Sequence, residues 1–217
     1  MNQNLTEMIF ILDRSGSMES LAEETIGGFN SLIKKQKAEH GEARVTTVLF
    51  DDEYEVLHDH VPIQQVGRLT GKEYYARGCT ALLDAVGFTI DRTGSRLAET
   101  AEENRPGRVI MVITTDGYEN ASRHYSKSQL REMIRRQTDV YKWEFLFLGA
   151  NMDAVSEADS LGIRPCMAAT YSPNRTGMRS VFGAVGRMID IMKLRDDDYY
   201  DEDEFVDQCE GIMSSVK

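Results

Sequence analysis

Side chains that end in oxygen recur in three short motifs of the sequence. Asp13, Ser15 and Ser17 stand at alternate positions directly after an apolar run. Thr80 lies in a glycine-containing turn, and Asp116 ends a second apolar run, just before a glycine. Carboxylates and hydroxyls suit hard cations, and Mg²⁺ is usually held by one or two carboxylates together with other oxygen groups and waters. Mn²⁺ accepts the same ligands. The motifs therefore predict an Mg²⁺ or Mn²⁺ site made by Asp13, Ser15, Ser17, Thr80 and Asp116.

Two buried strands would bring the aspartates to one edge of a sheet. Residues 8–12 are apolar without interruption, and residues 109–113 form a similar run. Such runs are typical of strands that are buried on both faces in a parallel sheet. Because each run leads to an aspartate, Asp13 and Asp116 are expected at carboxyl ends of strands, where open α/β sheets bind their ligands.

Helix and strand patterns alternate along the rest of the chain. Helical spacing of apolar residues predicts helices at residues 18–39, 80–103 and 175–194, and Ser126 with Gln129 predicts a capping box for a helix that ends near residue 141. Further strands are expected at residues 43–50, 53–61, 143–148 and 166–170. The alternation predicts an α/β fold: a doubly wound, mostly parallel six-stranded sheet with one antiparallel edge strand and helices on both faces.

Several polar residues also have interpretations that need no metal. Ser20 and Glu23 could form a capping box for the first helix. Asp84 is interpreted as an acid in the first turn of its helix, favoured by the helix dipole, rather than as a ligand. His58 and His60 would share one face of a strand and could bind zinc, although no cysteine or third histidine stands nearby at a ligand-like spacing.

The segment before Thr80 contains two adjacent tyrosines and an arginine. Tyr74, Tyr75 and Arg77 would lie close to the predicted metal site. They could shape what docks there, or the tyrosines could simply pack the loop onto the domain.

The three motifs together resemble the von Willebrand factor type A (vWA) family, in which Asp-x-Ser-x-Ser, a threonine in a turn and Thr-Asp-Gly form a metal-ion-dependent adhesion site. The resemblance covers residues 6–194, and the motifs occur in the family's order. It implies that Ser15 and Ser17 ligate the metal directly and that Asp13 acts through water. Thr80 and Asp116 would exchange direct and water-mediated roles between two conformational states.

The same resemblance implies a Rossmann-like strand order of 3-2-1-4-5-6. In this order the strands that end at Asp13 and Asp116 are neighbours whose following helices go to opposite faces, which is a topological switch point. Cys79 departs from the family pattern, because many members have a second glycine there. The amino-terminal sequence favours the stand-alone intracellular type found in prokaryotes.

Length and composition indicate one folded domain followed by an acidic tail. The chain has 217 residues, of which 41% are hydrophobic and 28% charged, as in ordinary globular proteins. We expect a vWA domain at residues 1–194. Seven acids fall within residues 196–204, so residues 195–217 are expected to be an acidic tail that can include a short helix.

Charge and cysteine content narrow the expected surroundings. The formal net charge of −11 disfavours nucleic acid, since affinity for phosphate backbones comes mainly from Lys and Arg. No stretch approaches the ~20 apolar residues that a membrane span needs. The amino terminus lacks the pattern of a signal peptide, and the three cysteines are odd in number and far apart. These features predict a cytoplasmic protein that does not bind membranes.

The leading functional hypothesis is a non-enzymatic, metal-dependent protein-binding module. An open position on the ion would capture a carboxylate from a partner protein, and the resemblance suggests a component of an ATPase or stress-response system as that partner. The alternative is a Mg²⁺-dependent hydrolase or phosphatase-like enzyme, although a phosphatase of the haloacid dehalogenase type needs a second aspartate where this chain has Ser15. No phosphate-binding Gly-rich loop is present in the sequence. A third possibility is a structural subunit whose metal site is not used.

Overall fold

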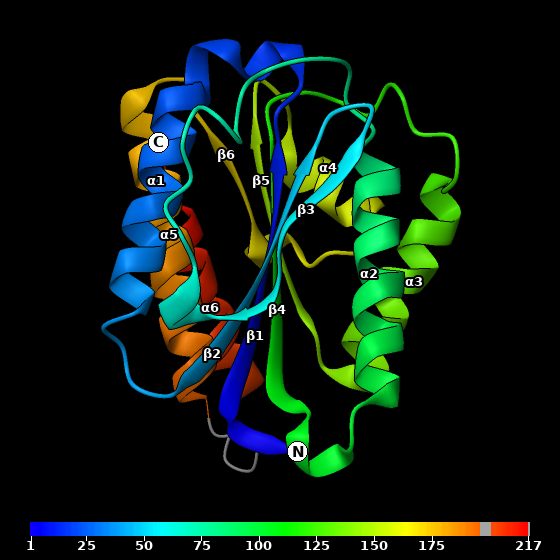
Figure 1. The fold of residues 1–217 in the computed structure, drawn as a ribbon, viewed down its shortest axis with the longest axis vertical. Helices are drawn as coiled ribbons and strands as arrows, with labels where there is room; N and C mark the ends of the chain where they lie inside the picture. Colours follow the sequence, from blue (N-terminus) through cyan, green and yellow to red (C-terminus); the bar gives the residue numbers. More distant parts are fainter. Residues whose placement is uncertain (196–200, 217) are drawn as a thin grey trace.

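Six strands form one sheet in the computed structural model, which describes residues 1–195 and 201–216. The spatial order is β3-β2-β1-β4-β5-β6 (Figure 1). The strands are β1 (Asn2–Asp13), β2 (Glu42–Phe50), β3 (Tyr54–Pro62), β4 (Pro106–Thr115), β5 (Glu144–Ala150) and β6 (Ala168–Tyr171). The edge strand β3 pairs antiparallel with β2, and the other pairs are parallel. The predicted fold class and strand order are confirmed.

Helices cover both faces of this sheet. The α-helices are α1 (Ala22–Gln36), α2 (Leu82–Glu99), α3 (Lys127–Tyr141), α4 (Ala154–Ser160), α5 (Arg175–Leu194) and α6 (Glu202–Met213). Short 3₁₀ helices are η1 (Gly16–Leu21), η2 (Ile63–Gln65), η3 (Glu102–Asn104) and η4 (Pro165–Met167). Figure 1 shows α1, α5 and α6 on one side of the sheet and α2 and α3 on the other. In the described parts of the chain, no helix combines the length and apolar character that crossing a membrane requires.

The central strand β1 positions the first motif. Its residues 8–12 are fully buried, because β2 and β4 flank the strand and helices cover both of its faces. In the parallel register with β4, Leu12 lies opposite Thr114. The residues that follow, Asp13 and Thr115, therefore emerge next to each other at the carboxyl edge of the sheet.

The two predicted capping boxes have different outcomes. The box of Ser126 and Gln129 is confirmed: the Gln129 amide donates to Ser126 Oγ at 3.3 Å, and the Ser126 amide donates to Gln129 Oε1 at 2.9 Å. The box of Ser20 and Glu23 is wrong. The chain first forms η1, so α1 starts later than the box requires, and its N-cap residue is Leu21, which has no side-chain cap.

The pair His58 and His60 does not form the regular strand face that their spacing suggests. The pairing of β3 with β2 shifts register around these residues, and His60 has a positive φ of 53°. The Nδ1 atom of His60 lies 2.5 Å from the Oε2 atom of the buried Glu7. Within the described residues, no cluster of three or more His, Cys, Asp or Glu side chains is arranged to hold a metal.

The C-terminal segment, expected as an acidic tail, includes a helix that packs on the domain. Asp201 caps α6, because its Oδ1 accepts the backbone amides of Asp203 at 3.0 Å and Glu204 at 3.2 Å. Phe205, Cys209 and Met213 lie four residues apart and are at most 5% exposed. They face α5 and η4, while the acids face outward. An acidic composition is thus compatible with a buried apolar stripe. The acidic run at residues 196–200 lies outside the described residues.

Candidate metal centre

The carboxylate of Asp13 is fixed by two hydrogen bonds at the end of β1. Its Oδ1 accepts the backbone N–H of Ser15 at 2.7 Å, and its Oδ2 accepts the hydroxyl of Thr115 at 2.6 Å. Asp13 is fully buried. Both of its oxygens are therefore held in place by protein donors before any ligand arrives. Thr115 was not predicted as a site residue, although it directly precedes Asp116 in the third motif.

The two serines of the first motif connect to the second aspartate. Ser15 Oγ lies 3.1 Å from Ser17 Oγ, and the hydroxyl of Ser17 donates to Asp116 Oδ1 at 2.5 Å. The chain reverses here because the amide of Met18 bonds to the carbonyl of Ser15 as η1 begins. Four of the five predicted residues, Asp13, Ser15, Ser17 and Asp116, thus form one cluster.

Thr80 lies on a neighbouring loop that is tied to this cluster through its backbone. Its amide donates to Asn120 Oδ1 at 2.9 Å, and its carbonyl accepts the amide of Asn120 at 3.0 Å. The carbonyl of Gly78 accepts the amide of Gly16 at 3.2 Å. Within the described residues, no hydrogen bond joins the Thr80 side chain to the other four predicted ligands. Backbone hydrogen bonds therefore hold the Thr80 loop beside the first motif and against Asn120.

Gly78 is required by the shape of this loop. Its φ of +66° lies in the left-handed region that favours glycine, and a Cβ there would lie 1.8 Å from Asp52 Oδ1. The same oxygen accepts the amide of Cys79 at 3.2 Å. Because Gly78 supplies the left-handed turn, the exposed Cys79 that follows it does not have to adopt a positive φ.

Burial raises the pKa values of both carboxylates of the cluster. Burial raises the pKa of Asp13 from 3.8 to about 6, although hydrogen bonds from Thr115 and Ser15 oppose the shift. Burial also raises the pKa of Asp116, against the hydrogen bond from Ser17. Each anion would be stabilised by a nearby positive charge. A cation among these oxygens would supply that charge.

A buried arginine directly follows Asp13 and ties the loop after β1 to neighbouring loops. Arg14 is fully buried, and its Nε donates to Asp51 Oδ2 at 2.8 Å. Arg77 Nε donates to the same oxygen at 2.7 Å, and Arg14 also forms an ion pair with Glu55 at 2.8 Å. These pairs connect the loop after β1 to the start of β3 and to the loop before Thr80. Sequence analysis missed Arg14 and Asp51, because their 37-residue separation leaves no local pattern.

Two further acids organise the loop that follows Asp116. The carboxylate of Asp84 accepts the backbone amides of three consecutive residues, 123–125, at 2.8–2.9 Å. Glu119 accepts the amides of residues 83, 121 and 122 at 2.6–2.9 Å. Asp84 is indeed in the first turn of α2, but its main contacts are with this loop rather than with its own helix. Together with Asn120, the two acids fix the loop against the start of α2.

Three tyrosines border the cluster in different ways. Tyr74 is buried and its hydroxyl donates to the carbonyl of Asp13. Tyr75 is 47% exposed, and the guanidinium groups of Arg14 and Arg77 lie 5.7 and 5.5 Å from its ring centre. Tyr118, two residues after Asp116, is 55% exposed. Tyr74 therefore packs the loop, whereas Tyr75 and Tyr118 present aromatic surface to solvent.

Comparison with known proteins identifies the fold. The sequence matches no family profile and no curated protein. The vWF domain of the type V pili tip protein Mfa5 from Porphyromonas gingivalis has a similar structure, with a TM-score of 0.62 and 10% identity over 88% of this chain and 97% of that one. The fold is that of a vWA domain. A von Willebrand factor type A structure from Catenulispora acidiphila matches with a TM-score of 0.54 and 16% identity, over 83% of this chain and 41% of that one.

One similar vWA structure is described with a metal. It is the proximal thread matrix protein 1 of the mussel byssus "with zinc occupied MIDAS motif", which matches with a TM-score of 0.57 and 14% identity. The match covers 83% of this chain and 46% of the byssus protein, so this chain spans less than half of that protein's length. At such low identity the similarity concerns the fold.

Proposed function

We propose that this vWA domain is a non-enzymatic, metal-dependent protein-binding module. A Mg²⁺ or Mn²⁺ ion would be held by Asp13, Ser15, Ser17, Thr80 and Asp116, and it would accept a carboxylate of a partner protein. The observation that carries the proposal is the close approach of oxygen atoms from two separate strand ends. The proposal places the domain in the cytoplasm and its partner in an ATPase or stress-response system.

The spacing of these oxygens fits an octahedral cation. With ligand distances of about 2.1 Å, neighbouring ligands of Mg²⁺ lie about 3 Å apart. The Oγ atoms of Ser15 and Ser17 are 3.1 Å apart, and Ser17 Oγ lies 2.5 Å from Asp116 Oδ1. The first distance needs no adjustment, and the second needs a small opening. Hydroxyls and carboxylates are also the hard ligands that these ions prefer.

Each residue would have its own part in holding the ion. Ser15 and Ser17 would ligate directly. Asp13, whose two oxygens already accept protein hydrogen bonds, suits a role through water. Asp116 accepts the hydroxyl of Ser17, and the resemblance to the vWA family suggests that Thr80 and Asp116 exchange direct and water-mediated roles. The bound ion would supply positive charge that an incoming carboxylate can coordinate.

The rim of the site supports a protein partner. Tyr75 and Tyr118 lie on the two loops that flank the cluster, and both are about half exposed, at 47% and 55%. Exposed tyrosines and arginines are enriched where protein interfaces gain most of their affinity. An ion surrounded by such side chains would bind a carboxylate on a folded surface more tightly than a free carboxylate.

The contact between Ser17 and Asp116 also supports the alternative of a Mg²⁺-dependent hydrolase. Asp116 could act as a base for the hydroxyl of Ser17, which lies 2.5 Å away. Turnover of p-nitrophenyl phosphate or p-nitrophenyl acetate in Mg²⁺, lost in Ser17→Ala, would favour this enzyme over the binding module.

Calorimetry and affinity capture test the proposal. We expect Ser17→Ala to weaken Mg²⁺ binding by about tenfold or more, since loss of even an indirect contact typically costs 10- to 100-fold. Ser128→Ala, which removes an exposed hydroxyl of α3, is the matched control. Immobilised wild-type protein should capture a partner in Mg²⁺ and release it in EDTA, and Ser17→Ala should capture none. Equal metal affinity in wild type and Ser17→Ala would refute the site.

A further inference from the structure

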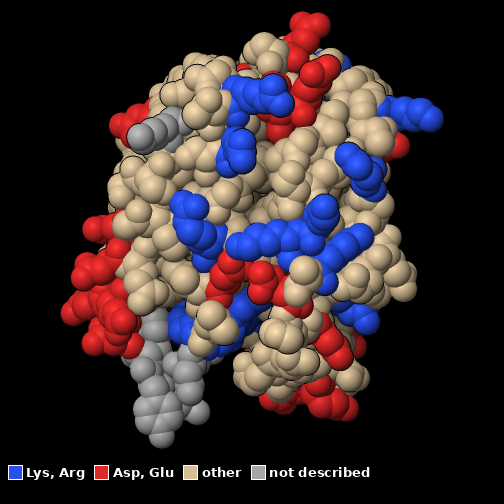
Figure 2. All heavy atoms as spheres, turned by 90° about the vertical axis from the view of Figure 1, so that its left-hand side faces the viewer, with Lys and Arg blue, Asp and Glu red and all other residues tan. Residues whose placement is uncertain are grey.

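Two hollows lie on either side of α5, on the face of the molecule that α1, α5 and α6 form. One, of about 690 Å³, lies between α1 and α5, and the other, of about 600 Å³, lies between α5 and α6. They share Arg179, Gly183 and Arg187 of α5. We call the two hollows together the α5 groove. Figure 2 shows Lys and Arg side chains gathered across the middle of this face.

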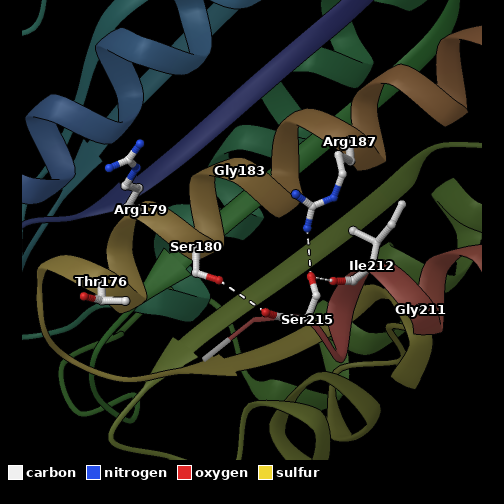
Figure 3. Close-up of a pocket in the computed structure, with 8 residues that line it drawn as sticks. All are labelled: Thr176, Arg179, Ser180, Gly183, Arg187, Gly211, Ile212 and Ser215. Carbon is white, nitrogen blue, oxygen red and sulfur yellow. Dashed lines mark hydrogen bonds between the residues drawn. The ribbon is translucent and has the colours of Figure 1, made fainter.

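In the parts of the chain that the structure describes, no acid is paired with the arginines of the groove. Arg175, Arg179 and Arg187 are exposed and line it. Among the described residues, neither Arg175 nor Arg179 belongs to an ion pair. Arg187 reaches the hydroxyl of Ser215 at 2.8 Å, as Figure 3 shows.

The positions of Arg175 and Arg179 in α5 are unfavourable for positive charges. Arg175 and Arg179 are one turn apart, a spacing at which like charges repel each other. They also occupy the amino-terminal end of α5, where the helix dipole disfavours cations, and the first turn contains no acid to compensate. Both unfavourable terms would be removed by an anion bound in the groove.

Glycines keep the floor of the groove open. At Gly27 of α1 and Gly211 of α6, an added Cβ would meet nothing within 4 Å, and at Gly183 it would meet only the tip of Arg187 at 3.8 Å. Packing therefore does not require these glycines. By contrast, a Cβ at Gly28 would collide with Phe182. Glycine lowers the stability of a helix interior, and here its effect is to leave room beside the arginines.

We propose that the α5 groove binds an acidic peptide segment of a partner protein. Arginine guanidinium groups bind carboxylates through paired hydrogen bonds, and three of them lie along one groove. The groove is acidic only at Glu23 and Glu24 on α1, so the carboxylates would lie on the α5 side. This binding surface is separate from the metal centre and needs no metal.

Fluorescence anisotropy with a labelled ten-residue polyglutamate peptide tests the proposal, in 50 mM salt with EDTA present. Binding by the wild-type protein is expected, and Arg179→Glu should weaken it by about tenfold, the effect of losing one or two charge-assisted contacts. The control Arg136→Glu makes the same change of charge on the exposed face of α3, across the sheet, and should change the affinity less than twofold. An equal loss of peptide affinity in the two variants would overturn the proposal, because it would show that binding responds to overall charge alone.

A second variant separates the shape of the groove from its charge. Gly183→Leu keeps every charge, improves helix propensity and fills the space between Arg179 and Arg187. We expect it to weaken peptide binding about tenfold or more without lowering the melting temperature. Unchanged affinity in Gly183→Leu would overturn the proposal, as would dimerisation in sedimentation experiments that Arg179→Glu abolishes. Because every measurement is made in EDTA, failure of the metal site would leave these results unaffected.

Discussion

Replacing Asp13 with asparagine should make the metal-free protein more stable. The fold holds this carboxylate in a fully buried position, and burial raises its pKa from 3.8 to about 6. A group whose pKa is higher in the folded state adds stability when it is protonated, below its unfolded value. That stability is lost as the pH rises through the folded pKa. Above pH 7 the ionised Asp13 therefore weakens the metal-free fold.

The size of the effect follows from the shift. A change of one pKa unit corresponds to about 1.4 kcal/mol, so a shift from 3.8 to about 6 corresponds to about 3 kcal/mol. Asparagine has the same shape and stays neutral, and its side-chain oxygen can still accept the amide of Ser15. In EDTA at pH 7.5, we expect Asp13→Asn to be more stable than wild type by up to about 3 kcal/mol. At pH 5 the difference should fall to about half, because Asp13 is then mostly protonated in the fold.

Urea unfolding followed by the fluorescence of Trp143, the single and buried tryptophan, measures this difference. Asp207→Asn, which removes an exposed carboxylate from α6, is the control for the loss of one charge. Saturating Mg²⁺ should reverse the order of stability, because a ligand stabilises only the protein that binds it. Equal stabilities in EDTA at pH 7.5, or a gap that widens at pH 5, would refute the account of Asp13 as an anion strained by burial.

Other parts of the structure give predictions of their own. Asp51→Asn should lower the free energy of unfolding by about 3 kcal/mol, because the buried Arg14 would lose its buried charged partner and keep only the half-exposed Glu55; a loss under 1 kcal/mol in urea titrations would contradict this. Gly78→Ala should lower both the melting temperature and the Mg²⁺ affinity, whereas Gly71→Ala, at an open position, should change neither. Phe205→Ala should cost about 3 kcal/mol or more by denaturant unfolding, if α6 is part of the core. Circular dichroism should be unchanged by EDTA, since the core forms without a metal; cooperative loss of the spectrum would show a structural ion.

The features that local sequence defines were predictable. The apolar runs before Asp13 and Asp116 specify two buried strands, and their parallel pairing brings the two ends together. The helix predicted at residues 175–194 matches α5 (Arg175–Leu194), because its apolar stripe is unbroken. A capping box is also local, since Ser126 and Gln129 are three residues apart.

Features that depend on distant residues were not predictable. The ion pair of Arg14 with Asp51 joins two loops that only the folded sheet brings together. The backbone hydrogen bond of Thr80 to Asn120 joins two loops 40 residues apart, which spacing does not encode. At residues 202–213 a short helix was expected within the acidic tail, but its packing on α5 and η4 depends on contacts with distant parts of the chain.

The packing of α6 also determines which fragments of this chain are practical to study. A fragment that stops at Leu194, where the sequence alone suggests that the domain ends, would remove the side chains of Phe205, Cys209 and Met213 from their buried positions. The surfaces of α5 and η4 that they cover would then be open to solvent, including the thiol of Cys166. Exposed apolar patches and free thiols promote aggregation and oxidation. Expression, crystallisation and labelling experiments should therefore retain the chain through α6.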